Sequence, residues 1–277
     1  MQKTKEIFIT KSNGEKEFFD AEKLESSLVR AGASLESINE IVAHIDRELK
    51  DGMSTSQIYK HALFLLTKTE KKVASRYSLR RAVMDLGPSG FPFEGFVGEI
   101  MRQRGFTVET DKVVMGECVA HEVDVIAYNE NKLIMMEAKF HNELGIKSDL
   151  KIALYVKARF DDLKGKTYFY GKERKLDEGW LITNTKFTTT AIQYGACVGL
   201  TMVGWNYPVK GNLQDMIEDG DLHPITCLTN LGQHHTNELL GRGVVLCKTI
   251  LENIDILKDI GLKDFEIDKI KKEINNL

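Results

Sequence analysis

The spacing of apolar residues shifts from a helical to a strand period near residue 106, and this shift constrains the fold more than any other feature. Between residues 21 and 84, apolar side chains recur every three or four positions, as at Ile38 and Ile41. This is the period of helices that bury one face. Over residues 106–139 β-branched residues become frequent, and apolar and polar positions alternate, with the densest apolar stretch at 123–128. The sequence therefore predicts a helical first part followed by a part that contains a sheet.

The first part begins with a predicted β-hairpin over residues 5–20. Asn13-Gly14 favours the tight turn, because both residues tolerate positive φ. Asp20 stands where a helix N-cap is expected, and Ser54 or Thr55 should cap a later helix. The glycine- and proline-rich segment 87–92 is the strongest break in the chain, so we place a domain boundary there.

The second part is predicted to be α/β, with a mixed sheet core flanked by helices. Strands are expected at 113–115, 123–128 and 133–137, helices at 93–104 and 149–163, and a β-α-β unit over 180–205. The last segment is helical, and its two apolar stripes around Gly261 predict either a helix-hairpin-helix or a packing and dimerisation pair. The expected domains are 1–88, 89–209 and 210–277.

Overall composition narrows the cellular setting but not the partner. Lys and Arg number 38 against 41 Asp and Glu, so the net charge of −3 gives no support for nucleic-acid binding, and a local basic face would have to supply it. No apolar run reaches the roughly 18 residues of a membrane helix, and the N-terminus shows no signal-peptide pattern. The widely spaced Cys118, Cys197, Cys227 and Cys247 indicate reduced thiols. We expect a cytoplasmic protein with no membrane partner.

Asp124, Glu137 and Lys139 form the most informative cluster. Glu137 and Lys139 share one face of a strand, and a hairpin turn centred on Glu130 would bring Asp124 beside Met136 and Glu137. Two neighbouring carboxylates suit Mg²⁺, and a nearby lysine can orient a water or neutralise phosphate charge. The alternative is a structural ion pair at the end of a hairpin.

Two helices flank this cluster. On the helix at 93–104, Glu94 falls on the rim of the apolar arc and can reach the sheet edge, whereas Glu99 faces solvent. On the helix at 149–163, Lys151 and Tyr155 share a surface suited to phosphate contact, with Asp162 and Arg159 beside them. The buried stripe of that second helix is expected at Leu150, Ala153, Leu154 and Phe160.

The order of these motifs resembles the PD-(D/E)XK nucleases and, more specifically, Mrr-type restriction endonucleases. The resemblance rests on Phe93-Glu94, Val123-Asp124 and Glu137-Ala138-Lys139, and it covers about 90–205. It implies a restriction endonuclease-like core in which Asp124, Glu137 and the Ala138 carbonyl hold Mg²⁺ or Mn²⁺. Lys139 would position the attacking water, and Glu94 would support a second ion or its water shell. Lys151 and Tyr155 would contact DNA.

The start of the chain is similar to ATP-cone domains, which bind ATP or dATP. The match runs through Ile9, Lys11, Gly14, Phe18, Asp20 and Lys23 to Ala74, Arg76, Tyr77 and Arg80. It implies that Lys11 and Lys23 contact nucleotide phosphates. Ser12 stands where the family usually has arginine.

Together these patterns predict a metal-dependent DNA endonuclease that hydrolyses phosphodiester bonds and is regulated by ATP or dATP. We expect DNA, a nucleotide and further copies of the chain as partners. Two alternatives stay open. One is a nucleotide-responsive regulator that binds DNA with a nuclease-like fold and does not cut it. The other is an oligomerising nucleotide sensor with no DNA role.

Overall fold

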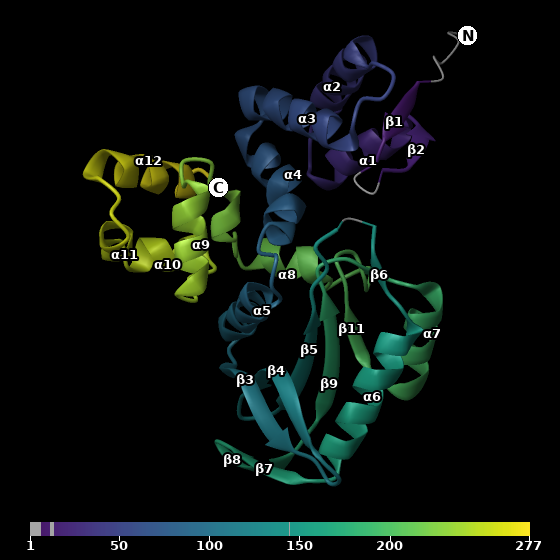
Figure 1. Cartoon of the computed structure of the whole chain (residues 1–277), viewed down its shortest axis with the longest axis vertical. Helices are drawn as coiled ribbons and strands as arrows, with labels where there is room; N and C mark the ends of the chain where they lie inside the picture. The colour runs from purple at the N-terminus through teal and green to yellow at the C-terminus, as the bar shows by residue number, and fades with distance from the viewer. Residues whose placement is uncertain (1–6, 12–13, 144) are drawn as a thin grey trace. The chain divides into compact units, whose positions relative to one another are not determined.

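The computed structural model describes residues 7–11, 14–143 and 145–277 (Figure 1). The chain divides into two compact units. One comprises Met1–Arg81 with Lys272–Leu277, and the other comprises Ala82–Lys271.

The N-terminal unit consists of a short hairpin and a set of helices. Its elements are β1 (Phe8–Thr10), β2 (Lys16–Phe18), α1 (Ala21–Arg30), α2 (Leu35–Glu48), α3 (Thr55–Thr69) and most of α4 (Lys71–Met84). The hairpin is antiparallel and pairs Phe8 with Phe18. Of its predicted turn residues, Gly14 has a φ of +82°, and Asn13 lies outside the described residues. The predicted hairpin is therefore present in the part of it that the structure describes.

Local capping defines where these helices begin. The Asp20 side chain accepts a hydrogen bond from the Glu22 N–H at 3.0 Å, as predicted. Ser54 forms a capping box with Gln57 at the start of α3, which decides between the two predicted caps. The helices then bury apolar stripes against one another, and Leu66 is fully buried.

The second unit contains a five-stranded sheet with helices packed on it. Its first elements are α5 (Phe91–Gln103), β3 (Thr107–Met115), β4 (Ala120–Tyr128), β5 (Leu133–Lys139), β6 (Lys147–Ser148), α6 (Leu150–Lys164), β7 (Thr167–Tyr170), β8 (Lys172–Lys175), β9 (Glu178–Thr183), β10 (Lys186–Phe187), α7 (Thr189–Val198) and β11 (Thr201–Val203). The strand order is β11-β9-β5-β4-β3. Strands β3, β4 and β5 are antiparallel, whereas β9 and β11 are parallel to their neighbours. The predicted α/β class with a mixed sheet is confirmed.

Chain connections explain why the sheet is mixed. Tight turns join β3, β4 and β5, whereas longer connections that include α6 and α7 precede β9 and β11, and a parallel pair requires such a crossover. Both faces of the sheet are buried, since neighbouring Val125 and Ile126 on β4 are each inaccessible. The Ile126 face packs with α6 and α7, and the opposite face, which includes Thr110, meets α5 at Gly98.

The buried stripe of α6 differs from the predicted one. Ala153, Val156, Phe160 and Leu163 point into the core. Leu154 is 45% exposed, so its predicted burial is wrong. The sequence offered two overlapping apolar stripes, and the one continued by Val156 and Leu163 packs on the sheet because it is longer.

The C-terminal segment is helical, as predicted. It contains α8 (Leu213–Asp219), a 3₁₀ turn (Ile225–Cys227), α9 (Gln233–Gly241), α10 (Cys247–Glu252), α11 (Asp255–Asp259) and α12 (Asp264–Ile274). Gly261 has a φ of +86° and joins α11 to α12. The segment packs into the second unit up to Lys271, so the boundaries 89–209 and 210–277 stay a proposal. Among the described helices, none is long and apolar enough to span a membrane.

Candidate functional site

The β4–β5 hairpin brings Asp124 and Glu137 together. Val125 pairs with Met136, so the next step along the strands places Asp124 opposite Glu137. A turn centred on Glu130 predicted Asp124 beside Met136 and Glu137, and the observed register selects Glu137. The turn is closed by a hydrogen bond from the Asn129 N–H to the Lys132 carbonyl, so its centre lies between Glu130 and Asn131, half a residue beyond the predicted centre at Glu130.

The backbone of β5 fixes the orientation of Asp124. The Ala138 N–H donates to Asp124 Oδ2 at 2.7 Å. This bond crosses from the strand that carries Glu137 and Lys139. Burial raises the pKa of Asp124 and that of Glu137, and the positive charge of Lys139 opposes the rise in both, so it acts on both carboxyl groups. The structure therefore brings the three predicted residues to one end of the hairpin.

Glu94 reaches this group from α5. Its carboxylate lies against Gly90, where an added Cβ would be 3.3 Å from Glu94 Oε1, so the glycine leaves room for it. Burial and the neighbouring charge of Asp124 raise the pKa of Glu94 to about 7. Glu99 instead accepts a hydrogen bond from Arg102 at 2.6 Å on the other side of the helix. The structure thus separates the two acids as predicted.

The site holds more negative charge than its positive groups balance. Burial and the nearby Asp124 raise the pKa of Glu137 to about 7, although Arg159 and Lys139 oppose the shift. Burial also raises the pKa of Asp124, against the hydrogen bond from Ala138. Crowded carboxyl groups with raised pKa values favour binding of a cation, whose charge would reverse these shifts.

Two further acids add to this charge and were not identified from the sequence. Glu122 precedes Asp124 by two positions on β4, so both lie on the same face, and strand alternation is the signal that could have found it. Asp111 lies on β3 between residues that pair with Val123 and Val125, and has a φ of +54°. Both acids raise the pKa of Glu94. A non-glycine residue with positive φ stores strain, which is concentrated at functional sites.

Arg159, which the sequence placed beside Tyr155, also joins the acids, and this contact was not predicted. Its guanidinium forms an ion pair with Glu137, and the two side chains are only 11% and 18% exposed. It also donates to the Tyr155 hydroxyl at 2.6 Å and lies 4.8 Å from the centre of the Tyr155 ring. Tyr155 is therefore connected to the acid cluster, and Lys151 is exposed one turn earlier on the same helix. The Tyr155–Arg159 spacing of four residues was the available signal.

Asp162 does not join this surface, so its predicted position beside Lys151 is wrong. Its carboxylate accepts hydrogen bonds from the N–H groups of Cys118 and Val119 at 2.8 and 3.3 Å. His121 Nε2 lies 2.7 Å from the same carboxylate. Asp162 instead fixes the loop between β3 and β4.

In the N-terminal unit, Lys11 and Lys23 meet at one carboxylate. Their ammonium groups lie 3.0 and 3.2 Å from Glu17 Oε2. The hairpin contributes Lys11 and Glu17, and α1 contributes Lys23 near its N-terminus. Two ammonium groups that share one anion, beside a helix N-terminus, form a surface that can accept phosphate.

Family models match both ends of the chain. Residues 7–85 match the ATP cone domain, which confirms the predicted resemblance, and residues 223–277 match the C-terminal domain called AF1548-like. An uncharacterised protein of Archaeoglobus fulgidus is 34% identical over 167 residues, which make up 60% of this chain and 90% of that protein. The chain belongs to the AF1548-like family.

A crystal structure from this family supports the assignment. The protein of unknown function AF1548 is 31% identical, with a TM-score of 0.58 over 68% of this chain and all of that one. The structure of Can2 from Sulfobacillus thermosulfidooxidans with cyclic tetra-adenylate is 14% identical, with a TM-score of 0.36 over 75% of this chain and 64% of that one. A score this low carries no argument, so the Mrr-type assignment of this family member stays a proposal.

Proposed function

We propose that this chain is a Mg²⁺-dependent DNA endonuclease whose activity is regulated by ATP or dATP. The observation that carries the proposal is the juxtaposition of Asp124 and Glu137 at the end of the β4–β5 hairpin, with Lys139 beside them. Three features support it: the acids are largely buried, they carry excess negative charge, and the Ala138 N–H orients one of them.

The residues present fit a divalent cation. One oxygen of Asp124 accepts from Ala138 and one oxygen of Glu137 pairs with Arg159, so the second oxygen of each carboxylate remains for a hard cation. Asp124, Glu137 and the Ala138 carbonyl would hold it. When bound, Mg²⁺ or Mn²⁺ supplies Lewis acidity toward a phosphate oxygen and lowers the pKa of water.

The remaining residues would bind and orient the substrate. The Lys139 ammonium would position the attacking water and neutralise charge that develops on the phosphate. Glu94, with its pKa near 7, would exchange a proton with water at the edge of the site. Arg159 holds Glu137 and Tyr155 in place, and Tyr155 and Lys151 would contact the DNA backbone from α6.

Plasmid cleavage with Mg²⁺ or Mn²⁺ tests this assignment. The isosteric variants Asp124→Asn and Glu137→Gln should lose cleavage by at least about a hundredfold, since each removes a charged ligand. Glu99→Gln is the matched control, because it changes an acid on α5 that pairs with Arg102. Full cleavage by both site variants would show that this is not the active site.

Nucleotide binding is tested separately in the N-terminal unit. Lys11→Ala and Lys23→Ala should each weaken binding of ATP or dATP in calorimetry. Lys16→Ala, an exposed lysine on the same hairpin, should not. Size-exclusion chromatography with and without nucleotide then tests the proposed homo-oligomer. Unchanged nucleotide affinity in both site variants would refute the assignment of these lysines.

One observation favours the non-cleaving regulator as a second candidate. Arg159 already pairs with Glu137, one of the two carboxylates that a metal needs. In that case the protein would shift DNA in a nucleotide-dependent way without cutting it. The Arg159→Lys variant separates the two functions, since it weakens the clamp on Glu137 and should change cleavage only if a metal competes there.

A further inference from the structure

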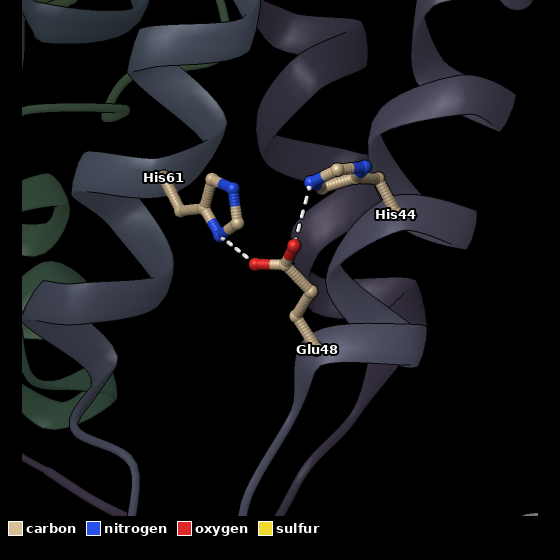
Figure 2. A group of neighbouring side chains, drawn as sticks. All are labelled: His44, Glu48 and His61. Atoms are coloured by element: carbon tan, nitrogen blue, oxygen red, sulfur yellow. Dashed lines mark ion pairs between the residues drawn. The ribbon is translucent and has the colours of Figure 1, made fainter.

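His44, Glu48 and His61 converge within the N-terminal unit, and the proposed function uses none of the three. His44 and Glu48 lie one turn apart on α2, and His61 lies on α3 (Figure 2). The Glu48 carboxylate points between the two imidazoles and offers one oxygen to each. Among the described residues, these three side chains form a group of histidine and acidic residues that could hold a metal ion, because one ligand atom from each lies within 4.8 Å of the other two.

The contacts between Glu48 and the two imidazoles are longer than ordinary hydrogen bonds. His44 Nε2 lies 3.3 Å from Glu48 Oε1, and His61 Nδ1 lies 3.4 Å from Glu48 Oε2. Both exceed the range of about 2.7–3.2 Å for an N–H···O hydrogen bond. One donor atom from each of the three residues lies within 4.8 Å of the other two. The edge of a tetrahedron with bonds of about 2.0–2.1 Å is about 3.3 Å, so small side-chain rotations would bring the three donors onto one cation.

We propose that His44, Glu48 and His61 bind a transition-metal ion of intermediate hardness, namely Zn²⁺. Two imidazole nitrogens and one carboxylate oxygen suit zinc, whereas Mg²⁺ prefers an all-oxygen set such as Asp124 with Glu137. The side chains of His44 and His61 are 35% and 26% exposed, so a metal can enter from solvent.

One of the three residues also borders open space. His44 lines a cleft of about 850 Å³ between α2 and α3, together with the acids Glu40 and Asp46 and the bases Arg47 and Lys68. Three protein ligands leave at least one position of a four-coordinate zinc for water or another small ligand.

Zinc here would join α2 to α3 across the loop 49–54. Glu48 is the last residue of α2, and His61 lies in the second turn of α3. The bound ion would close this short loop and stabilise the N-terminal unit, since a ligand that binds only the folded state raises its stability.

Equilibrium dialysis of the metal-stripped full chain with Zn²⁺, in millimolar Mg²⁺ to occupy the carboxylate site, tests the proposal. We expect one zinc per chain, with at least about tenfold weaker binding in His44→Ala and His61→Ala. His234→Ala, an exposed histidine of the second unit, is the matched control. Glu48→Gln keeps the size of the side chain and should also weaken zinc binding. It provides a second test in case the alanine variants misfold, and circular dichroism shows whether each variant is folded.

The Asp124→Asn protein separates this proposal from the nuclease proposal. It should bind zinc as the wild type does, and the absorption spectrum of Co²⁺ bound in its place should show imidazole coordination that His61→Ala abolishes. Zinc binding that is absent, that survives in both histidine variants, or that disappears in Asp124→Asn would overturn the site.

Discussion

The substitution Gly179→Ala tests how α6 is held over the sheet. Gly179 lies on β9, and an added Cβ would be 2.6 Å from Cγ and 3.0 Å from Cβ of Phe160 on α6. Carbon atoms in contact normally lie about 3.5–4.0 Å apart, so the two elements must separate by about 1 Å. Phe160 is 4% exposed within the core and cannot rotate into solvent.

The expected cost follows from overpacking. Inserting a methyl group into a packed core costs about 1–3 kcal/mol, and the short contact places Gly179→Ala near the upper end of that range. At about 2–4 °C per kcal/mol for a unit of this size, the melting temperature should fall by about 4–12 °C. Displacement of α6 would also loosen the pair between Arg159 and Glu137, so the same variant should lose activity.

Trp180 and Trp205 are the two tryptophans and both belong to the second unit, so fluorescence during urea unfolding reports on that unit. Gly241→Ala, at the end of α9 with open space around it, is the control and should be neutral or slightly stabilising. Phe160→Leu should partly rescue Gly179→Ala, with a coupling of about 1–2 kcal/mol. Strictly additive effects, or a stable Gly179→Ala protein, would refute the packing of α6 on β9.

Three further outcomes follow from local contacts. Glu17→Gln should tighten binding of ATP in calorimetry, because the carboxylate that holds the two nucleotide-site lysines no longer competes with phosphate; weaker binding would contradict this. Asp162→Asn should lower the melting temperature at neutral pH. His121 lowers the pKa of Asp162 in the folded state, so this contribution is present above its unfolded pKa and is lost as pH falls below about 4, where the two proteins should converge. A thiol reagent should modify exposed Cys197 before Cys118, whose pKa Asp162 raises, and should reach buried Cys247 only on unfolding; early labelling of Cys247 would show that α10 opens.

The sequence predicted the features that depend on near neighbours in the chain. The N-cap at Asp20, the α5 helix that carries Glu94 and the strand that carries Glu137 follow from spacing within one turn or one strand. The sequence could not choose between Met136 and Glu137 as the partner of Asp124, because turn geometry, not the midpoint of the loop, fixes strand pairing. The choice between Val156 and Leu154 as the buried residue of α6 depends on the sheet surface below it, which spacing within the helix does not contain.

Contacts between distant elements account for the rest. Arg159 lies 22 positions from Glu137 in the sequence, and the ion pair forms only because α6 crosses over the hairpin. His61 is similarly separated from His44 and Glu48, and their convergence depends on how α3 returns along α2. The i,i+4 spacing of His44 and Glu48 places both on one face of α2, but such a pair alone does not define a metal site.

The loop after Glu48 connects the proposed zinc site with the proposed nucleotide site. The Gly52 N–H donates to the Phe8 carbonyl at 2.8 Å, and the Thr10 N–H donates to the Met53 carbonyl at 3.0 Å, so the loop holds the strand that ends at Lys11. Zinc that fixes this loop should therefore order the hairpin before nucleotide binds. Since coupling between two ligands is reciprocal, ATP should raise zinc affinity by the same factor, about 5-fold or more, as zinc raises ATP affinity. Calorimetric titrations in both orders measure the two factors, which must agree, with His61→Ala as the uncoupled control; no change in either affinity would show that the loop does not link the sites.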